Sequence, residues 1–496
     1  MEQRFSSRIG FILSALGIAV GTGNVWRFPR IVAQASGDEG AGAFLFAWAI
    51  FLIVWSVPLI LAEYALGRKG RIGLVSTFTR FAGKGFSWMG AFVGFVVVGI
   101  MSYYSVVTGW CLYYLIKTGT GTLDILSARG IWDSFQSSNM PIFFHALAMG
   151  LGSLAVWRGV ESIEQVNKIL VPILLGVLLL GLAGTLTLEG AWQGICFLFT
   201  PDWRTLAKSQ VWLEALTQNA FDTGAGWGMM LTYGAYLQRR YGVVKNAVIT
   251  AAGNNAVSIL AAMVIFGTVF AIMGPDEGNA GIMEVMKTSG PAATGLTFIW
   301  IPQLFANFPA GNLLAVLFFL GLSCAAFSSL ISMIELFVKV IVDLGVLRRN
   351  AITVVFMMGF LLGIPSASHL GFFQNQDFVW SLALIISGAF IAFVVIRFGA
   401  KRFRADAIDG LPGDWKAGRL WDILITYIVP LLAVLLIAWW LYLSMTLYAP
   451  DTWYNPFESF SVMTCLMQWG LVMVTCIILN RWLSQSTVIS QPKQNN

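Results

Sequence analysis

Charged residues are scarce in this sequence, and so are the residue types that build metal sites and disulfide frameworks. Asp, Glu, Lys and Arg make up 11% of the 496 residues, and the chain has two histidines and five cysteines. His145 and His369 are far apart, and the cysteines follow no pairing rhythm. This pattern argues against a metal centre of that kind and against a disulfide-stabilised fold. Residues 1–8 also lack a cleavable signal pattern, so the first apolar segment is expected to stay in the mature protein.

Hydrophobic residues, in contrast, account for 57% of the sequence. Twelve apolar runs are long enough to cross a lipid bilayer as α-helices. The sequence therefore predicts an all-α membrane protein with twelve transmembrane helices. The predicted spans lie near residues 10–35, 42–66, 88–116, 141–157, 165–187, 213–238, 246–273, 311–342, 350–368, 376–398, 421–447 and 460–483.

The positive charges are distributed unevenly among the loops. A net charge of +6 can indicate nucleic-acid binding, but in a membrane protein the positive residues more often mark cytoplasmic loops. An even number of spans puts both termini on one side, and the loops of that side hold most of the lysines and arginines. We therefore expect a multi-pass protein of the plasma (inner) membrane, with both termini cytoplasmic and no nucleic-acid partner. The opposite loops hold little more than Arg129, Arg204, Lys208 and Lys287.

The first apolar run contains the motif GIAVGTGNVWRFP at residues 17–29, which weakens an α-helix. On this motif alone, its glycines fit either a close helix-packing face or a broken helix that lines a site. A phosphate cradle is disfavoured because no strand precedes the glycines and no lysine follows them. Asn24 and Arg27, polar residues at membrane depth, favour the broken helix. The backbone groups freed by such a break can hold a small cation beside an anionic group.

A second interruption, QNAFDTGAGWG at residues 218–228, falls in the sixth predicted span. Paired interruptions are typical of transporters built from two repeats of inverted topology, with the ligand between them near the membrane midplane. Asp222 strengthens this interpretation, although a buried neutral aspartate is the alternative. The predicted units are a cytoplasmic N-terminus (1–9), two inverted five-helix repeats (10–187 and 188–398), two further helices (399–484) and a cytoplasmic tail (485–496).

Three weaker signals lie elsewhere in the chain. Ser328 and Ser329 on the eighth span are by themselves typical of helix packing, and Tyr103 and Tyr104 on the third are typical of a core. The loop at 274–309, rich in Gly, Pro and Asn, is too long for a simple connector. We predict that it forms an extracellular lid.

Together these motifs resemble those of the neurotransmitter:sodium symporter family, in its bacterial branch. The resemblance extends through the first ten spans, and the motif at residues 17–29 is its most specific part. The other residues that carry it are Pro58, Glu63, Tyr64, Gly67 and Arg68 in the second span, Tyr103 and Tyr104, the broken sixth span, and Ser328 and Ser329.

The resemblance implies two sodium sites, both made of oxygen ligands that suit a hard cation. The first would use Ala19, Asn24, the Asp222 position and Asn254, completed by the carboxylate of the substrate. The second would use the carbonyls of Gly17 and Val20 with Ala325, Ser328 and Ser329.

The resemblance also implies substrate contacts and gates. The substrate contacts would be Ala19, Thr22, Gly23, Ile100, Tyr104, Phe221, Gly224, Trp227, Ser329 and Met333. Arg27 and Asp377 match the outer gate pair, and Asp343 matches the inner gate, with Arg4 as its expected partner. Phe5 stands where the family has a tryptophan.

These features are interpreted as a sodium-coupled symporter that imports a neutral amino acid by alternating access. Gly21 stands where amine-carrying relatives have an aspartate, so the ligand is expected to bring its own carboxylate. The apolar pocket residues favour a large apolar or aromatic side chain. Chloride is not expected as a cofactor, because Trp48 and Asp222 replace a tyrosine and a serine of the chloride site. The carboxylate of Asp222 is expected to balance the sodium charge instead.

Two other classes of membrane protein are the alternatives to a transporter. An amino-acid-binding membrane sensor would be expected to carry a sizeable soluble output domain, which this sequence lacks. A membrane-embedded enzyme would need a nucleophile or paired catalytic groups at one depth, and no such set is recognisable. The predicted protein is therefore not an enzyme, and the sensor is kept as the alternative.

Overall fold

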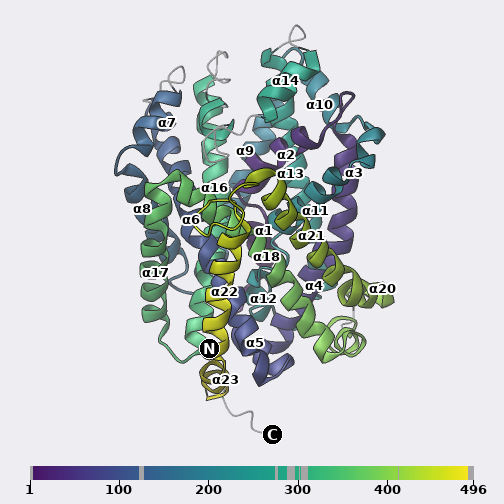
Figure 1. Ribbon diagram of the computed structural model, residues 1–496, viewed down its shortest axis with the longest axis vertical. Helices are drawn as coiled ribbons and strands as arrows, with labels where there is room; N and C mark the ends of the chain where they lie inside the picture. The colour runs from purple at the N-terminus through teal and green to yellow at the C-terminus, as the bar shows by residue number, and fades with distance from the viewer. Residues whose placement is uncertain are drawn as a thin grey trace.

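The computed structural model describes residues 4–121, 128–273, 278–287, 296–300, 302, 311–410 and 413–489. These residues form a bundle of helices with no strand among them (Figure 1). The first half of the chain contains α1 (Arg8–Ala19), η1 (Gly23–Arg27), α2 (Phe28–Ala35), α3 (Gly42–Phe51), η2 (Leu52–Ser56), α4 (Val57–Gly70), α5 (Leu74–Phe81), η3 (Lys84–Phe86), α6 (Ser87–Gly119), α7 (Ala128–Gln136), α8 (Met140–Ala155), α9 (Val160–Thr185), α10 (Ala191–Phe199), η5 (Trp203–Ala207), α11 (Ser209–Asp222) and α12 (Met229–Ala235).

The second half continues the bundle and ends in a bent helix pair. Its elements are α13 (Val244–Met273), α14 (Gly278–Lys287), η8 (Leu296–Trp300), α16 (Gly311–Asp343), α17 (Arg348–Ser368), α18 (Leu370–Phe398), α19 (Ala400–Phe403), η9 (Arg404–Ile408), α20 (Gly418–Ile423), η10 (Leu424–Ile428), α21 (Val429–Leu443), η11 (Ser444–Tyr448), α22 (Val462–Ile478) and α23 (Asn480–Ile489).

The helices account for the twelve predicted spans. Among the described residues, eight continuous helices are long and apolar enough to cross a membrane, and two bent pairs, at 8–35 and 462–486, each qualify as one span. The remaining two predicted spans are α8, which is shorter, and the interrupted pair α11 and α12. The predicted all-α class with broken first and sixth spans is confirmed.

The two interruptions have different local causes. In the first span, α1 ends at Ala19, Val20 is extended, and the following helical segment is tilted by 56°. In the sixth span, α11 ends at Asp222, and Gly224 and Gly226 both adopt positive φ before α12 begins. A Cβ atom on Gly226 would also lie 2.7 Å from the Cα of Gly388, so the close approach of α18 needs glycine there.

Two long helices form the scaffold around these breaks. Helices α6 and α16 are each 33 residues long, occupy the third and eighth spans, and pack against each other. Helix α16 also packs against α9, and α12 packs against α4. The broken segments are therefore held between continuous helices, which fixes the positions of the backbone groups that the breaks expose.

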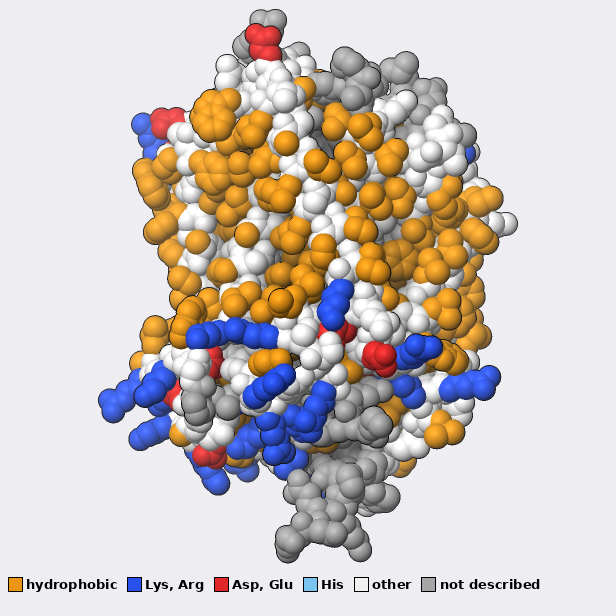
Figure 2. Space-filling model, turned by 180° about the vertical axis from the view of Figure 1, so that it is seen from behind, with side chains coloured by type: hydrophobic (Ala, Val, Ile, Leu, Met, Phe, Trp, Pro, Cys, Tyr) orange, Lys and Arg blue, Asp and Glu red, His pale blue; other side chains and the backbone are white. Residues whose placement is uncertain are grey.

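The outer surface has the character of a membrane protein. On the face shown in Figure 2, hydrophobic side chains form a broad band, and Lys and Arg gather below it. The start of α1 and α23 lie at this same lower end of the bundle (Figure 1). The chain is a multi-pass membrane protein. The assignment of that end to the cytoplasm stays a prediction, as does the division of the chain into the predicted units.

The predicted lid at 274–309 falls mostly outside the described residues. Only α14, η8 and residue 302 of this segment are described. Residues 490–496 of the predicted tail also lie outside the described part. The lid therefore stays a prediction.

Candidate functional site

A cavity of about 190 Å³ lies where the two interrupted spans meet α6 and α16. All ten predicted substrate contacts line it, and so do several residues that the sequence did not single out as contacts. The ten are Ala19, Thr22, Gly23, Ile100, Tyr104, Phe221, Gly224, Trp227, Ser329 and Met333. The additional residues are Ile18, Gly21, Trp26, Arg30, Tyr103, Val107, Gln218, Met229, Phe373 and Ser381, and the cavity is also lined by Asn24, Arg27, Asp222 and Asp377.

One end of the cavity presents polar groups from the break after α1. The Tyr104 hydroxyl accepts hydrogen bonds from the backbone N–H of Thr22 at 3.1 Å and from its hydroxyl at 3.4 Å. The backbone N–H of Gly21 donates to the side chain of Asn24 at 2.8 Å. A Cβ on Gly21 would meet Tyr104 and the Ser329 hydroxyl at 3.0 Å. Because Tyr104 only accepts in these bonds, its own O–H can still donate to a carboxylate at this end of the cavity.

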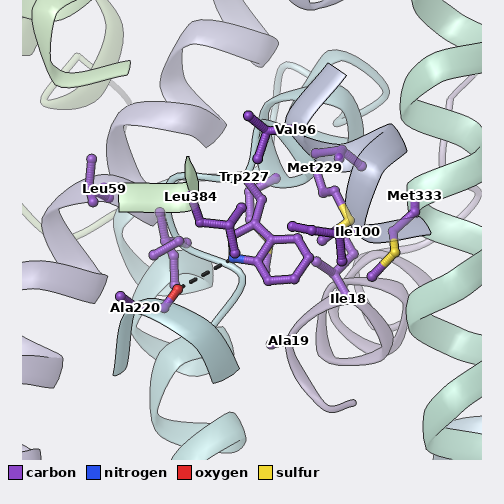
Figure 3. Packing of buried hydrophobic residues seen from close by; sticks show 14 of the residues in the cluster. Ile18, Ala19, Leu59, Val96, Ile100, Ala220, Trp227, Met229, Met333 and Leu384 are labelled. Atoms are coloured by element: carbon purple, nitrogen blue, oxygen red, sulfur yellow. Dashed lines mark hydrogen bonds between the residues drawn. The ribbon is translucent and has the colours of Figure 1, made fainter. Parts of the chain in front are cut away.

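The other end of the cavity is apolar and is built around Trp227. Its indole is 8% exposed and donates through Nε1 to the carbonyl of Ala220 at 3.4 Å. Figure 3 shows Ile18, Ile100 and Met229 around the ring, with Met333 beside them. These side chains offer an apolar wall to a ligand whose charged groups lie at the Tyr104 end.

The four residues predicted for the first sodium site come together. One end of the Asn254 side-chain amide lies 3.0 Å from the main-chain oxygens of both Ala19 and Asp222. The side chain of Asn24 donates to Asn254 and to Ser258, each at 2.8 Å. The main-chain oxygens of Ala19 and Asp222 thus converge at the Asn254 side chain, and such carbonyl oxygens, together with an amide oxygen, are the donor set of a hard cation.

The second predicted set forms where the end of α1 meets α16. The Ser329 hydroxyl lies within hydrogen-bonding distance of the carbonyls of Gly17 and Ile18, both at 3.3 Å, and of Val20 at 3.4 Å. Ser328 donates to the carbonyl of Ala325 at 3.0 Å. All five predicted residues therefore lie at one junction, to which the structure adds the carbonyl of Ile18.

The carboxylate of Asp222 lies beside the first set. Its side chain is buried, and one oxygen accepts a hydrogen bond from Gln218 at 3.4 Å. The other oxygen has no hydrogen-bond partner in the described part of the chain. An ionised carboxylate in this position would need a nearby positive charge, since burial without one is costly.

Glu63 is a site-supporting residue to which the sequence analysis gave no role. It is fully buried on α4, and its carboxylate accepts hydrogen bonds from the backbone N–H groups of Gly226 at 2.6 Å and Leu231 at 3.1 Å. These N–H groups are left without helical partners by the break in the sixth span. Glu63 therefore holds the broken segment in place.

The predicted outer gate residues, Arg27 and Asp377, both line the cavity but do not pair here. Arg27 and Asp377 also line a second hollow of about 360 Å³. The Arg27 guanidinium lies 4.1 Å from the ring centre of Phe221, and Asp377 accepts a hydrogen bond from Ser381 at 3.3 Å. The ion pairs found among the described residues do not include Arg27 with Asp377. The cavity and the outer hollow are therefore adjacent and share lining residues.

Neutralising Arg27 is expected to impair transport more than ligand binding. If the Arg27–Asp377 pair forms only when the outer side closes, its loss weakens one state of the cycle. Arg27→Ala should therefore lower the rate of uptake at least several-fold while the half-saturating ligand concentration in detergent changes less. Arg204→Ala, on an exposed stretch, serves as the control. Normal uptake by Arg27→Ala would instead favour an arginine that only extends to the outer surface.

The opposite end of the bundle is closed by packing and ion pairs. Asp343 forms an ion pair with Lys339 at 2.7 Å and accepts a hydrogen bond from the backbone of Gly73. Its predicted pair with Arg4 stays a prediction. An ion pair of the buried Glu335 with the half-buried Arg348, at 2.5 Å, was not anticipated from the sequence.

Phe5 contributes to the same closed end. Its ring packs against Phe11 and Tyr233, with ring centres 5.3 and 5.7 Å apart. Its backbone N–H donates to the carbonyl of Tyr236 at 3.2 Å. The segment before α1 is thus anchored beneath the cavity.

Comparison with known proteins identifies the family. The model of the sodium:neurotransmitter symporter family matches residues 2–141 and 136–486. A sodium-dependent transporter of Methanocaldococcus jannaschii is 30% identical over 87% of this chain and 89% of its own length. The sodium-dependent transporter YhdH of Bacillus subtilis is 29% identical over 87% of this chain and 96% of its own.

A solved structure extends the match to the fold. The crystal structure of MhsT in complex with L-phenylalanine has a TM-score of 0.74 and 31% sequence identity, and the match covers 88% of this chain and 99% of MhsT. This chain belongs to the sodium:neurotransmitter symporter family.

Proposed function

We propose that this protein is a sodium-coupled symporter that carries an amino acid across the membrane by alternating access. The observation that supports this most is the placement of two oxygen-rich sets at the α1 terminus, next to the cavity. A cation in the first set would sit beside the carboxylate of the substrate, so each would favour binding of the other. No bond-making step is part of this function.

The proposed substrate is a neutral amino acid with a large apolar or aromatic side chain. Its carboxylate would lie between Tyr104 and the first cation, and its side chain would lie against Trp227 and Met333. The complex of MhsT with L-phenylalanine supports this class, because MhsT is 31% identical in sequence to this chain. The apolar wall offers no partner for a charged side chain.

Thermal unfolding of the purified protein tests the proposal. A ligand that binds only the folded state stabilises it in proportion to its occupancy. Leucine, phenylalanine or tryptophan is expected to raise the Tm in sodium and much less in potassium. A larger sodium-dependent shift with glycine or glutamate would contradict the proposed side-chain class. Equal shifts in sodium and potassium would contradict sodium coupling.

Amines that lack a carboxylate are expected not to compete. Gly21 supplies no negative side chain for an amine, and the cavity instead offers the Tyr104 hydroxyl to a carboxylate. The concentration of tryptamine that inhibits the binding of labelled tryptophan should therefore be at least about a hundredfold higher than that of unlabelled tryptophan. This is the loss expected because tryptamine cannot form the charged hydrogen bonds or the cation contact of a carboxylate. If tryptamine inhibits strongly at concentrations where unlabelled tryptophan inhibits only weakly, the carboxylate requirement is refuted.

The alternative function, a membrane sensor that binds an amino acid without moving it, is separated by counterflow. Proteoliposomes loaded with unlabelled substrate should accumulate labelled substrate transiently if the protein is a transporter. The Arg27→Ala variant is a useful comparison, since it is expected to bind but to exchange slowly. Sodium-dependent binding with no counterflow by the wild type would favour the sensor.

A further inference from the structure

Asn167 on α9 is a buried amide that the proposed site does not yet use. Its side chain is fully buried, and neither its oxygen nor its nitrogen has a hydrogen-bond partner in the described part of the chain. Buried amides are nearly always hydrogen-bonded, because an unpaired one carries the full penalty of its desolvation. An amide buried in this state points to a polar ligand.

The surroundings of Asn167 show which predicted site this amide faces. A Cβ atom on Gly17 would lie 2.8 Å from the side-chain oxygen of Asn167 and 3.1 Å from the Cβ of Ser328. Asn167 and Ser328 therefore flank Gly17 from α9 and α16. Gly17 and Ser328 both belong to the second predicted cation set, so the unpaired oxygen of Asn167 faces the edge of that set.

Other polar groups extend from Asn167 toward the end of the bundle where α1 begins. Ser14 lies one turn before Gly17 on the same face of α1, and its buried hydroxyl also has no partner among the described residues. Closer to the end of the bundle, Glu164 accepts hydrogen bonds from the backbone and hydroxyl of Ser6, at 2.6 and 2.5 Å. Polar groups thus line the contact between α1 and α9 from its end up to the second set.

The opposite side of the second set is apolar. Val20 and Ala325 pack there in a hydrophobic cluster with Leu174 and Leu178, which lie farther along α9 than Asn167. A cation in the second set would therefore meet hydrocarbon on one side and the Asn167 carboxamide on the other. Since a small cation needs oxygen partners, the Asn167 side is where its remaining contacts or its water must lie.

We propose that Asn167 is a further residue of the second cation site, and that its carboxamide oxygen acts as an outer ligand of a sodium ion there. The inference rests on the proposed function, because that function requires a sodium ion in this set. The residue would set how strongly this site holds its cation.

The test is a sodium titration of substrate binding to the purified full-length protein. Asn167→Asp keeps the shape of the side chain and adds a negative charge near the site, so the half-saturating sodium concentration should fall by roughly tenfold. Asn167→Val removes the oxygen and should raise that concentration several-fold. Val171→Ala, one turn farther along α9 and also buried, is the matched control and should leave it unchanged.

The two proposals can fail separately. A wild-type protein whose ligand binding does not depend on sodium would overturn both. Sodium-dependent binding with the same half-saturating concentration in the wild type, Asn167→Asp and Asn167→Val would overturn the role of Asn167 alone. Should Asn167→Asp not fold, Asn167→Val gives the same decision, because an unchanged sodium requirement in that variant contradicts the proposal.

Discussion

Glu63→Ala is expected to abolish sodium-dependent ligand binding, even in preparations where the protein remains folded. The substitution removes the acceptor of the backbone N–H groups of Gly226 and Leu231, which lie in the broken sixth span. Leaving two buried N–H groups without partners costs about 2–6 kcal/mol. Part of this cost can be avoided only if the broken segment moves, and the segment also carries Gly224 and Trp227 of the cavity.

Comparing Glu63→Ala with Glu63→Gln shows whether ligand binding needs both acceptor oxygens of the carboxylate or only one. Glutamine keeps one acceptor oxygen but turns an amide N–H₂ group toward backbone donors, so partial loss of binding is expected. Glu161→Ala, at an exposed position near the start of α9, is the control and should behave as the wild type. The measurements are the Tm without ligand and the half-saturating ligand concentration in sodium. Normal ligand affinity in Glu63→Ala would show that the break holds its shape without this carboxylate.

Asp222→Asn is the second substitution with a large expected effect. The Asp222 carboxylate lies next to the first cation set and would stabilise a bound sodium ion. Because the site is buried, removing this negative charge is expected to weaken cation binding by about tenfold or more. We propose that this charge takes the place of chloride. Wild-type uptake should therefore be the same when chloride is replaced by gluconate, while Asp222→Asn should take up little substrate in either medium.

A second substitution at this position tests the role of the charge directly. Asp222→Ser restores the residue type that the chloride-binding relatives use, and any uptake it regains should require chloride. Asp133→Asn, an exposed change on α7, controls for nonspecific effects on expression. Loss of wild-type uptake in gluconate would refute the compensation idea, and Asp222 would then need another explanation.

Local features of the sequence were enough to predict the spans and the breaks. Long apolar runs are visible without any knowledge of packing, and the glycines near Gly21 and Gly226 mark where a helix cannot continue. The predicted cation and substrate residues came from matched motifs, and the structure brings them to one place. These assignments could be made because each motif is contiguous or nearly so in the sequence.

The polar partners that join distant helices could not be predicted in this way. Glu63 reaches residues of the sixth span, and Asn167 reaches the edge of α1, only because of how these helices pack. A buried glutamate or asparagine on an apolar helix has the same sequence appearance whether it supports a break, faces a cation or pairs with an arginine. The partner is decided by tertiary packing, which no local pattern records.

The break in the sixth span also limits how the selectivity of this cavity can change over time. A side chain at Gly226 would collide with the backbone of Gly388, and at both Gly224 and Gly226 it would be strained by the positive φ. At Gly224 the lining of the cavity is therefore main chain and can hardly be altered by point mutation. Ile100 and Met333 lie on continuous helices and tolerate apolar replacements of similar size far better. A lineage that adapts this carrier to a new nutrient would therefore be expected to change α6 and α16 first.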